Sequence, residues 1–298
     1  MSKVLLTGVT GFLGSSLAKG LLNSGYQVVG LKRFNSDIKN IASIISSLSL
    51  FNVEDGINNL FLLNPDIDFI IHGATNYGNK GQLLTEILLS NIVFPLQIIE
   101  SIPAGKRISF INTDTYFSKM SENYDYLSYY IQTKKIFRSL ATQLAVSKKC
   151  PFISMQLEHV YGVGDSLNKF VSNTIQRLIH NESCIDLTAG EQSRDFIYVD
   201  DVVNAYLHVI GSKELIESGN SITIEVGTGK SVTIQEFMTL AKKITKSSST
   251  LNFGKIPYRN DELMKSAADN KILEQLGWSP KVTLEVGIEK LSTSLRFD

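Results

Sequence analysis

One tyrosine and one lysine are spaced for joint acid–base chemistry. Tyr130 and Lys134 stand four residues apart, so on a helix both side chains lie on one face, one turn apart. A nearby cation favours the phenolate, and we therefore expect Lys134 to lower the pKa of Tyr130 towards the range of a working acid–base catalyst. The spacing alone also fits an exposed pair on a helix surface, because the chain has eleven tyrosines.

A hydroxyl group precedes this pair in the chain. Residues 107–113 read as a strand, and the segment continues as Asp114, Thr115 and Tyr116. A hydroxyl at the carboxyl end of such a strand, close to Tyr130, can hydrogen-bond a substrate carbonyl oxygen. We take Thr113 as this hydroxyl, with Thr115 as its rival. Either threonine can instead be a β-branched residue that fills a strand.

The first residues of the chain indicate an anion site. Residues 3–7 form an apolar, β-prone run, glycines follow at positions 8, 11 and 14, and a helical pattern covers about residues 15–23. This arrangement of strand, glycine turn and helix can hold a pyrophosphate. Glycine lets the backbone approach the anion, and the helix N-terminus offers N–H groups and the positive end of its dipole. An ordinary glycine turn is the alternative. The residues assigned to the dinucleotide phosphates are Gly8, Gly11, Phe12, Leu13 and Gly14.

The tip of the second strand selects the cofactor. Residues 27–31 read as a strand that leads to Lys32 and Arg33, and the nearest acid in the sequence is Asp37. An acid at this tip binds a free ribose 2′-hydroxyl, whereas a base accommodates a 2′-phosphate. Two cations without an acid favour NADPH (NADP) over NAD. The alternative is a solvated strand end, where lysine and arginine are common.

Composition excludes several classes of protein. The 298 residues are 43% hydrophobic and 19% charged, with 29 basic and 29 acidic side chains, so we expect a folded protein with neither nucleic acid nor membrane as its partner. No apolar run reaches membrane-spanning length, and glycines break the N-terminal run, which therefore does not read as a signal peptide. Cys150 and Cys184 make no disulfide framework, and the four histidines show no ligand spacing. We expect no metal and a cytoplasmic location.

Strand and helix patterns alternate through the first half of the chain. Apolar strands recur near 69–71, 107–113 and 152–157, with helical patterns at 81–101 and 130–147. This alternation predicts an α/β fold, a Rossmann-type doubly wound parallel sheet, with Pro95 kinking or splitting its helix. Shorter elements after residue 160 predict a smaller C-terminal α/β substrate lobe. We therefore assign 1–160 to an NADP-binding domain, to which about 195–225 returns, and 161–194 and 226–298 to the substrate lobe.

Together these features resemble a known family. The glycine motif, the Thr113 hydroxyl and the Tyr130–Lys134 pair resemble the extended short-chain dehydrogenase/reductases (the NAD-dependent epimerase/dehydratase family) that act on nucleotide sugars. The likeness covers nearly the whole chain. Details at 157–165, 168–170, 190–203 and 224–229 resemble its branch of CDP-linked 4-keto-deoxyhexose reductases, which serve O-antigen synthesis for lipopolysaccharide.

The resemblance implies roles for further residues. Thr113, Tyr130 and Lys134 are expected to be catalytic, the last two also touching the cofactor. The other expected cofactor-lining residues are Asn52 and Val53, where the family more often has Asp, and Ala74, Thr75 and Asn91. The expected residues for a nucleotide-sugar substrate are Thr113, Asp114, His159, Lys169, Arg194 and Arg259. The two arginines are expected to bind diphosphate, with surface charge as the alternative. A buried structural histidine is the alternative for His159 and our preferred interpretation of His72.

The family hosts several reactions, so the fold does not decide among them. Its sugar 4,6-dehydratases carry Thr-Asp-Glu, whereas this chain has Thr113, Asp114 and Thr115, so the base for the C5 proton is missing. NADPH suits net reduction of the C4 ketone of a nucleoside-diphosphate 4-keto-deoxyhexose. The alternatives are an NAD-dependent nucleotide-sugar 4-epimerase and, in another class, a non-catalytic dinucleotide-binding regulator, which typically lacks the Tyr–Lys pair. Apolar helices near 83–101 and 130–148 also suggest a homodimer.

Overall fold

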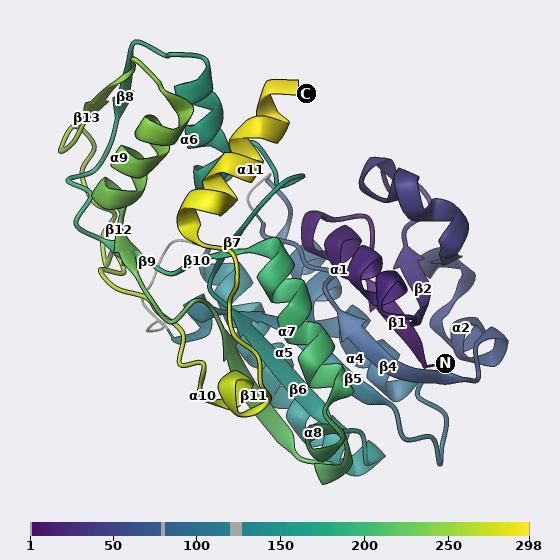
Figure 1. The fold of residues 1–298 in the computed structure, drawn as a ribbon. Coiled ribbons are helices and arrows are strands. Elements are labelled where there is room, and N and C mark those ends of the chain that lie inside the picture. Colours follow the sequence, from purple (N-terminus) through teal and green to yellow (C-terminus); the bar gives the residue numbers. More distant parts are fainter. Residues whose placement is uncertain (1, 79–80, 120–126, 298) are drawn as a thin grey trace. The chain divides into compact units, whose positions relative to one another are not determined.

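The computed structural model describes residues 2–78, 81–119 and 127–297 and divides into two compact units (Figure 1). Unit 1 consists of Met1–Gln156 and Tyr206–Ile224, and unit 2 of Leu157–Ala205 and Glu225–Asp298. The stretch at about 195–225, expected to return to the cofactor domain, is therefore divided at residue 205. Its first part belongs to unit 2 because β10 (Phe196–Tyr198) pairs there with β7 (His159–Tyr161).

A seven-stranded sheet forms the centre of unit 1, in the order β11-β6-β5-β4-β1-β2-β3. Its strands are β1 (Lys3–Thr7), β2 (Gln27–Lys32), β3 (Ser49–Asn52), β4 (Ile67–His72), β5 (Ser109–Thr115), β6 (Phe152–Leu157) and β11 (Ser221–Val226). The pairs from β5 through to β3 are parallel. The strand order changes direction beside β1, as in doubly wound dinucleotide-binding sheets. The predicted Rossmann-type fold is confirmed.

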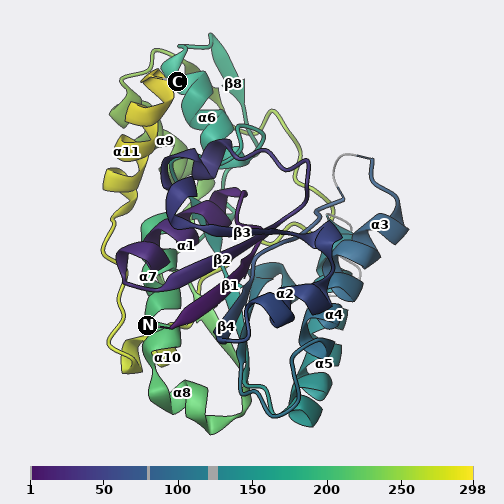
Figure 2. The same cartoon turned by 90° about the vertical axis from the view of Figure 1, so that its right-hand side faces the viewer.

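Helices cover both faces of this sheet. On one face lies α1 (Phe12–Asn23), and on the other lie α4 (Phe94–Glu100) and α5 (Ser128–Lys148) (Figure 2). The shorter helices are α2 (Ile57–Leu63), α3 (Leu84–Leu88) and α8 (Lys213–Ser218), and α7 (Val199–Gly211) runs from unit 2 into unit 1. Three 3₁₀ segments complete the unit, at Lys39–Ser47, Val53–Asp55 and Tyr116–Lys119. None of the helices in the described ranges has the length and apolar character needed to cross a membrane.

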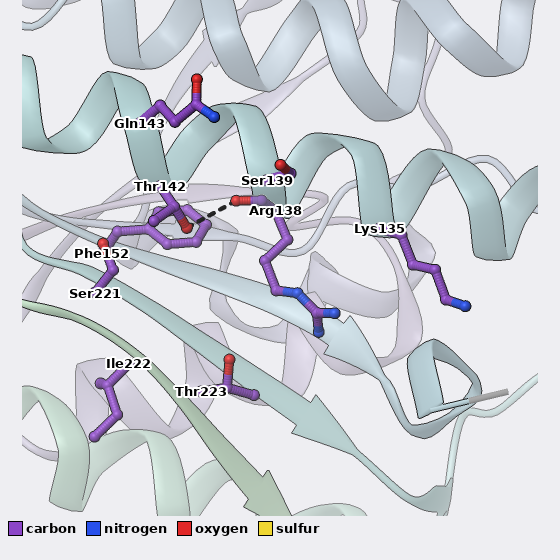
Figure 3. Close-up of a pocket in the computed structure, with 9 residues that line it drawn as sticks. All are labelled: Lys135, Arg138, Ser139, Thr142, Gln143, Phe152, Ser221, Ile222 and Thr223. Carbon is purple, nitrogen blue, oxygen red and sulfur yellow. Dashed lines mark hydrogen bonds between the residues drawn. The ribbon is translucent and has the colours of Figure 1, made fainter. Parts of the chain in front are cut away.

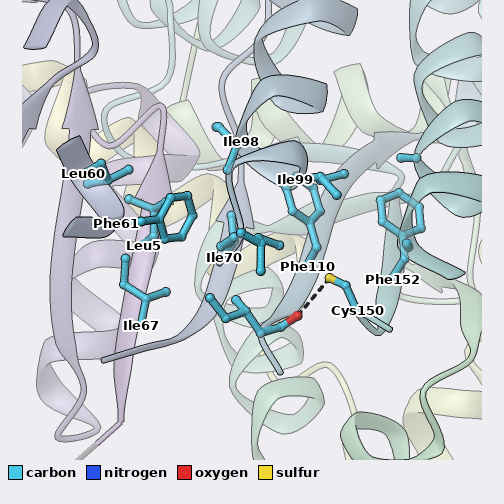
Figure 4. Close-up of a cluster of buried hydrophobic side chains, with 14 of the residues drawn as sticks. Leu5, Leu60, Phe61, Ile67, Ile70, Ile98, Ile99, Phe110, Cys150 and Phe152 are labelled. Carbon is cyan, nitrogen blue, oxygen red and sulfur yellow. Dashed lines mark hydrogen bonds between the residues drawn. The ribbon is translucent and has the colours of Figure 1, made fainter. Parts of the chain in front are cut away.

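A buried apolar core holds the strands under the second helical layer (Figure 4). Leu5, Ile70, Phe110 and Phe152 come from four strands, are at most 1% exposed and belong to one cluster with Ile98 of α4. Full burial of one such side chain contributes roughly 1.5–3 kcal/mol. The cluster therefore holds these four strands in fixed positions relative to one another and to α4.

The helix that contains Pro95 is divided, as predicted. It runs as α3, a wide π turn at Leu89–Val93, and then α4, with Pro95 in the first turn of α4. Proline has no N–H to donate to the carbonyl four residues earlier, so a regular α-helical ladder is interrupted at this point. The π turn carries Asn91, which is only 2% exposed.

Unit 2 combines helices with short sheets. Its longer helices, α6 (Phe170–Ile179), α9 (Ile234–Thr245) and α11 (Leu284–Phe297), pack against one another, and α10 (Lys271–Gln275) is short. Besides β7 and β10, β12 (Val232–Thr233) pairs with β9 (Ser193–Arg194), and β13 (Thr250–Asn252) with β8 (Cys184–Asp186). The fully buried Asp195 accepts hydrogen bonds from the backbone N–H groups of Thr228, Gly229 and Ala268. This carboxylate fixes the backbone beside Arg194.

Candidate active site

The glycine turn after β1 has the geometry of a phosphate-binding loop. Gly8 has a φ of +71°, and a Cβ there would lie 2.8 Å from the backbone nitrogen of Ala74. A Cβ on Gly14 would collide with the carbonyl oxygen of Gly8. Gly11 begins α1 as its N-cap, no side chain caps this helix, and its first turn has no acid. The helix start, with Phe12 and Leu13 in its first turn, therefore fits an incoming pyrophosphate.

Two buried polar side chains hold the ends of β1 and β4 together. The hydroxyl oxygen of Thr7 accepts from the N–H groups of Gly73 and Ala74, each at 3.1 Å. Its hydrogen is then available to His72 Nδ1, 2.9 Å away. Burial, followed by the charge of Lys134, lowers the pKa of His72 well below its usual value, which leaves the ring neutral and able to accept. The structural interpretation of His72 is confirmed.

The tip of β2 carries an acid as well as two cations. Lys32 Nζ donates to the carbonyls of Arg33 and Phe34, at 3.3 and 3.2 Å, and the Arg33 side chain is exposed. Glu54 accepts from the backbone N–H of Phe34 at 3.0 Å. In sequence the nearest acid is Asp37, but strand pairing brings Glu54 to the tip from twenty residues further on. An acid here favours a free 2′-hydroxyl, so the tip carries signals for both cofactors.

The two residues expected at the adenine lie beside this tip. Asn52 ends β3 directly opposite Lys32 of β2, and Val53 begins the next 3₁₀ segment. The amide of Asn52 donates to Asp55 at 3.3 Å. Val53 is partly buried and packs against the apolar core.

Asn91 holds the loop that follows β4. Its Oδ1 accepts from the N–H of Asn76 at 2.7 Å and from the Thr75 hydroxyl at 3.4 Å. Its Nδ2 donates to the carbonyl of Asn76 at 2.8 Å and to Thr133 Oγ1 at 3.0 Å. Because these contacts use both ends of a buried amide, we interpret Asn91 as a residue that positions Thr75 and Asn76.

Tyr130 and Lys134 lie together in the interior. They are 5% and 3% exposed, and Lys134 Nζ is 6.0 Å from the centre of the Tyr130 ring. The same Nζ donates to the backbone carbonyl of Thr113 at 2.8 Å. The fold thus brings the three residues expected to be catalytic to one place in unit 1.

The two threonines at the end of β5 have different partners. Thr113 Oγ1 lies 2.8 Å from the hydroxyl of Tyr206 in α7, a residue that the sequence analysis missed. The side chain of Thr115 is hydrogen-bonded with Tyr130. Of the two candidates, therefore, Thr115 contacts the phenol directly, and Thr113 contributes its carbonyl to Lys134.

Burial controls the protonation of the Tyr–Lys pair. The pKa of Tyr130 is raised well above its usual 10, first by burial and then by Tyr77 and Asp114, while the Thr115 hydrogen bond opposes the rise. Burial also lowers the pKa of Lys134 to about 8, with Asp114 opposing. The pKa of Tyr130 is therefore raised overall and does not fall as expected, because burial disfavours the charged phenolate. Tyr130 is a neutral phenol at neutral pH and can donate a proton.

Asp114 anchors the turn that carries Thr115. One of its oxygens accepts from the N–H of Thr115 and from Ser118, each at 2.8 Å. The other accepts from Ser154 at 3.2 Å and from Arg138 at 2.7 Å. Four donors occupy a carboxylate that is 3% exposed, so we interpret Asp114 as a positioning residue in place of the substrate contact that the resemblance implied.

Arg138 connects this anchor to a separate hollow of about 400 Å³ beside α5 (Figure 3). The lining residues are Lys135, Arg138, Ser139, Thr142 and Gln143 of α5, Phe152 of β6, and Ser221, Ile222 and Thr223 of β11. None of the expected site residues is among them, so this hollow is separate from the candidate active site.

In unit 2, the expected anion-binding residues gather around Arg194. This arginine is 6% exposed, and its Nη2 donates to Glu262 at 2.5 Å. The backbone of Glu262 in turn donates to the carbonyl of Arg259, whose side chain is exposed. An anion that binds Arg194 must therefore compete with the carboxylate of Glu262.

His159 and Lys169 lie within the electrostatic reach of Arg194. Burial, followed by the charges of Arg194 and Lys169, lowers the pKa of His159 to about 3. Lys169 Nζ forms an ion pair with Asp165 at 2.9 Å. His159 is therefore neutral, and an anion in this region meets two cations that already have acidic neighbours.

The doubly wound sheet, the phosphate loop and the buried Tyr–Lys pair define a dinucleotide-dependent enzyme of the extended short-chain dehydrogenase/reductase type. Residues 4–227 match the NAD dependent epimerase/dehydratase family, and the chain belongs to this family. It is therefore an enzyme of the NAD(P)-dependent oxidoreductase type.

Relatives confirm the predicted resemblance to CDP-abequose synthases. The CDP-abequose synthases of Salmonella muenchen and Salmonella typhimurium are each 37% identical to this chain, over 290 and 293 residues, covering 97% of this chain and 96% of each relative. Among solved structures, UDP-glucuronic acid 4-epimerase from Bacillus cereus, in complex with UDP-glucuronic acid and NAD, has a TM-score of 0.83 and 25% identity, covering 99% of both chains. UDP-glucose 4-epimerase from Thermotoga maritima has a TM-score of 0.84 at 23% identity, with the same coverage, and shows the fold.

Proposed function

We propose that this chain uses NADPH to reduce the C4 ketone of a nucleoside-diphosphate 4-keto-deoxyhexose, in the manner of a CDP-abequose or CDP-paratose synthase, for O-antigen or related sugars. The observation that carries the proposal is the buried Tyr130, which lies beside Lys134 and Thr115 at the end of β5. Thr115 stands where sugar 4,6-dehydratases of the family have a glutamate, so the phenol has a proton to donate and dehydration lacks its base. The CDP-abequose synthases that are 37% identical to this chain support this assignment.

The residues present fit a dinucleotide. The glycine turn would hold its pyrophosphate, Asn52 and Val53 its adenine end, and Lys134 its nicotinamide ribose. Bound NADPH supplies hydride to C4 of the sugar. Tyr130 donates its proton to the oxygen on C4, so that one O–H bond breaks and another forms, and a phenolate remains. Thr115 donates a hydrogen bond to that phenolate, while Thr113, held by Tyr206, orients the C4 oxygen.

In unit 2 we propose Arg194, Arg259 and Lys169 as the cations for the substrate diphosphate, with His159 as a neutral donor to the sugar. Two observations support this. The charges of Arg194 and Lys169 both act on His159. The backbone N–H of Glu262, whose side chain binds Arg194, donates to the carbonyl of Arg259. Arginine suits phosphate because its planar guanidinium binds two oxygens at once.

The test is NADPH oxidation with CDP-, dTDP- and GDP-linked 4-keto-deoxyhexoses, with NMR of the product. Tyr130→Phe is expected to keep its fold and cofactor affinity but to lose about 10²–10⁴-fold in kcat, the usual contribution of a general acid. Thr115→Val should lower kcat more than Thr113→Val. Full turnover by Tyr130→Phe would contradict the assignment.

An NAD-dependent 4-epimerase is the second candidate, and Glu54 at the ribose tip is the observation that favours it. Such an enzyme recycles its cofactor. Purified protein that contains tightly bound NAD and interconverts 4-epimers without net NADPH consumption would favour this candidate over reduction.

We also propose a homodimer and a cytoplasmic location. The π turn and α5 pack against each other, yet they expose apolar side chains, including Leu89 (59%), Ile136 (44%) and Leu140 (42%). A second copy of this surface is the partner that fits it. Cys150 and Cys184 are both free thiols, which agrees with a reducing compartment.

A further inference from the structure

The side chain of Arg138 lies between the turn at Asp114 and the hollow beside α5. Its Nη1 donates to Asp114 at 2.7 Å, and the Asp114 side chain is fully buried, whereas that of Arg138 is 28% exposed. Its Nε and Nη2 have no acceptor among the residues that the structure describes. A guanidinium offers five N–H donors in a planar fork, so the donors that Asp114 does not use are available to a ligand.

The hollow has the size and the lining of a site for a small anion. Its volume of about 400 Å³ lies in the range of small-molecule sites, and all of its lining residues belong to unit 1. Two of these residues, Lys135 and Arg138, are cations, and Arg138 extends from α5 towards the strands (Figure 3). No acid is among the described residues that line the hollow. Its neutral hydrogen-bonding side chains are Ser139, Thr142, Gln143, Ser221 and Thr223.

A chain of hydrogen bonds leads from Arg138 to the catalytic tyrosine. Asp114 uses its other oxygen to accept from the backbone N–H of Thr115 at 2.8 Å, and the Thr115 side chain is hydrogen-bonded with Tyr130. A change in the attraction between Arg138 and Asp114 therefore acts on the turn that holds Thr115. Negative charge in the hollow can reach the phenol in this way without touching the cofactor or the sugar.

We propose that the hollow binds an organic phosphate, which shares the guanidinium of Arg138 with Asp114 and thereby slows proton donation by Tyr130. Phosphate suits the site because Lys135 and Arg138 provide two cations and the neutral side chains provide further hydrogen bonds. The phosphate and the Asp114 carboxylate are like charges that compete for one cation, so each weakens the binding of the other. This inference rests on the proposed function only for its effect on turnover.

Calorimetry with glucose 6-phosphate and inorganic phosphate tests the site, with glucose as the matched ligand that lacks the phosphate. Lys135→Gln should weaken the binding of glucose 6-phosphate about 5–20-fold, the effect of losing one hydrogen bond to a charged group. Arg194→Gln, which removes a cation of unit 2, should leave this binding unchanged. Failure of both phosphates to bind, equal affinity for glucose, or equal affinity in Lys135→Gln and the wild type would each overturn the inference.

The competition with Asp114 has its own binding test. Asp114→Asn removes the competing carboxylate and should tighten the binding of glucose 6-phosphate about 5–20-fold, within the usual range of coupling between two sites. A ligand that only fills the hollow, without drawing on the charge that holds Asp114, predicts the same affinity in this variant and in the wild type. That result would overturn the inference.

Turnover tests the effect on catalysis. Saturating glucose 6-phosphate should lower kcat for NADPH oxidation about 2–10-fold, because small displacements of catalytic groups are costly, while KM for the nucleotide sugar stays unchanged. An unchanged kcat, or a rise in KM alone, would overturn the inference, since the second result places the phosphate at the substrate site. Binding is measured without substrate. A protein that shows the expected binding differences but reduces none of the ketones would therefore support the hollow as a phosphate site and contradict the proposed function.

Discussion

Burial of Lys134 makes its charge depend on pH in the working range. Its pKa is about 8, so the ammonium is present below that pH and is lost above it. Because the cation is proposed to hold the nicotinamide ribose, we expect kcat/KM for NADPH to fall as pH rises through about 8, while Tyr130 stays protonated. Lys134→Arg, whose charge persists at high pH, should move the decline upward. The measurement is kcat/KM across neutral and alkaline pH, and an unmoved decline in Lys134→Arg would contradict the role.

The same residue affects stability in a defined direction. The folded pKa of Lys134 lies below its ordinary value of 10.5, so between about 8 and 10.5 the unfolded chain binds more protons. The contribution of Lys134 to the free energy of unfolding therefore rises with pH in this window. The cost of burying its charge is fully present below pH 8.

Glu54 places a negative charge at the β2 tip, where the 2′-phosphate of NADPH is proposed to bind, and this gives a prediction for cofactor choice. Removing one like charge near the surface is worth about 0.5–1 kcal/mol, so Glu54→Gln should raise the NADPH-to-NADH ratio of kcat/KM roughly two- to five-fold. Asp37→Asn is the matched control, since Asp37 is the nearest acid in sequence but bonds its own turn at Lys39. Equal shifts in both variants would show that general charge, and not Glu54, sets the preference.

Elements with local signals were predictable, and contacts between distant elements were not. Glycine spacing identified the phosphate loop, and the missing N–H of Pro95 identified the break in its helix, because both effects act within a few residues. Glu54 reaches the β2 tip only through strand pairing, and Tyr206 meets Thr113 across 93 residues. The raised pKa of Tyr130 was missed for the same reason, since burial is a property of the whole fold.

The packing of α1 on β1 depends on the absence of a side chain at Gly14. A Cβ there meets the backbone of Gly8, which cannot turn aside as a flexible side chain can. We expect Gly14→Ala to lower the free energy of unfolding by about 1–3 kcal/mol, the usual cost of overpacking, and to abolish NADPH binding. Gly211→Ala is the control, because nothing lies within 4 Å of its Cβ position. Urea unfolding with and without NADPH measures both effects, and wild-type behaviour of Gly14→Ala would contradict the packing argument.

At the scale of the whole molecule, one helical surface of unit 1 exposes apolar side chains among the residues that the structure describes. Ile136 and Leu140 lie one turn apart on α5, and Leu89 and Val93 lie one turn apart on the π turn. Two packed elements with apolar outer rows give the surface on which we propose that a second copy pairs, under a two-fold axis. Isolated exposed apolar residues elsewhere, such as Leu62 on α2, lack this arrangement.

A charge placed in this surface should therefore separate the dimer without unfolding the chain. Light scattering is expected to give twice the chain mass of 33.0 kDa for the wild type and the single mass for Leu140→Asp, because a desolvated, unpaired carboxylate is costly at an interface. Leu62→Asp makes the same change at a site that is 75% exposed and should leave the dimer intact. Circular dichroism shows that each variant is folded. A monomeric wild type would show that the proposed dimer does not form. A Leu140→Asp protein that keeps the doubled mass would place the interface elsewhere. The activity of the separated monomer would show whether pairing is needed to hold Tyr130 of α5 in place.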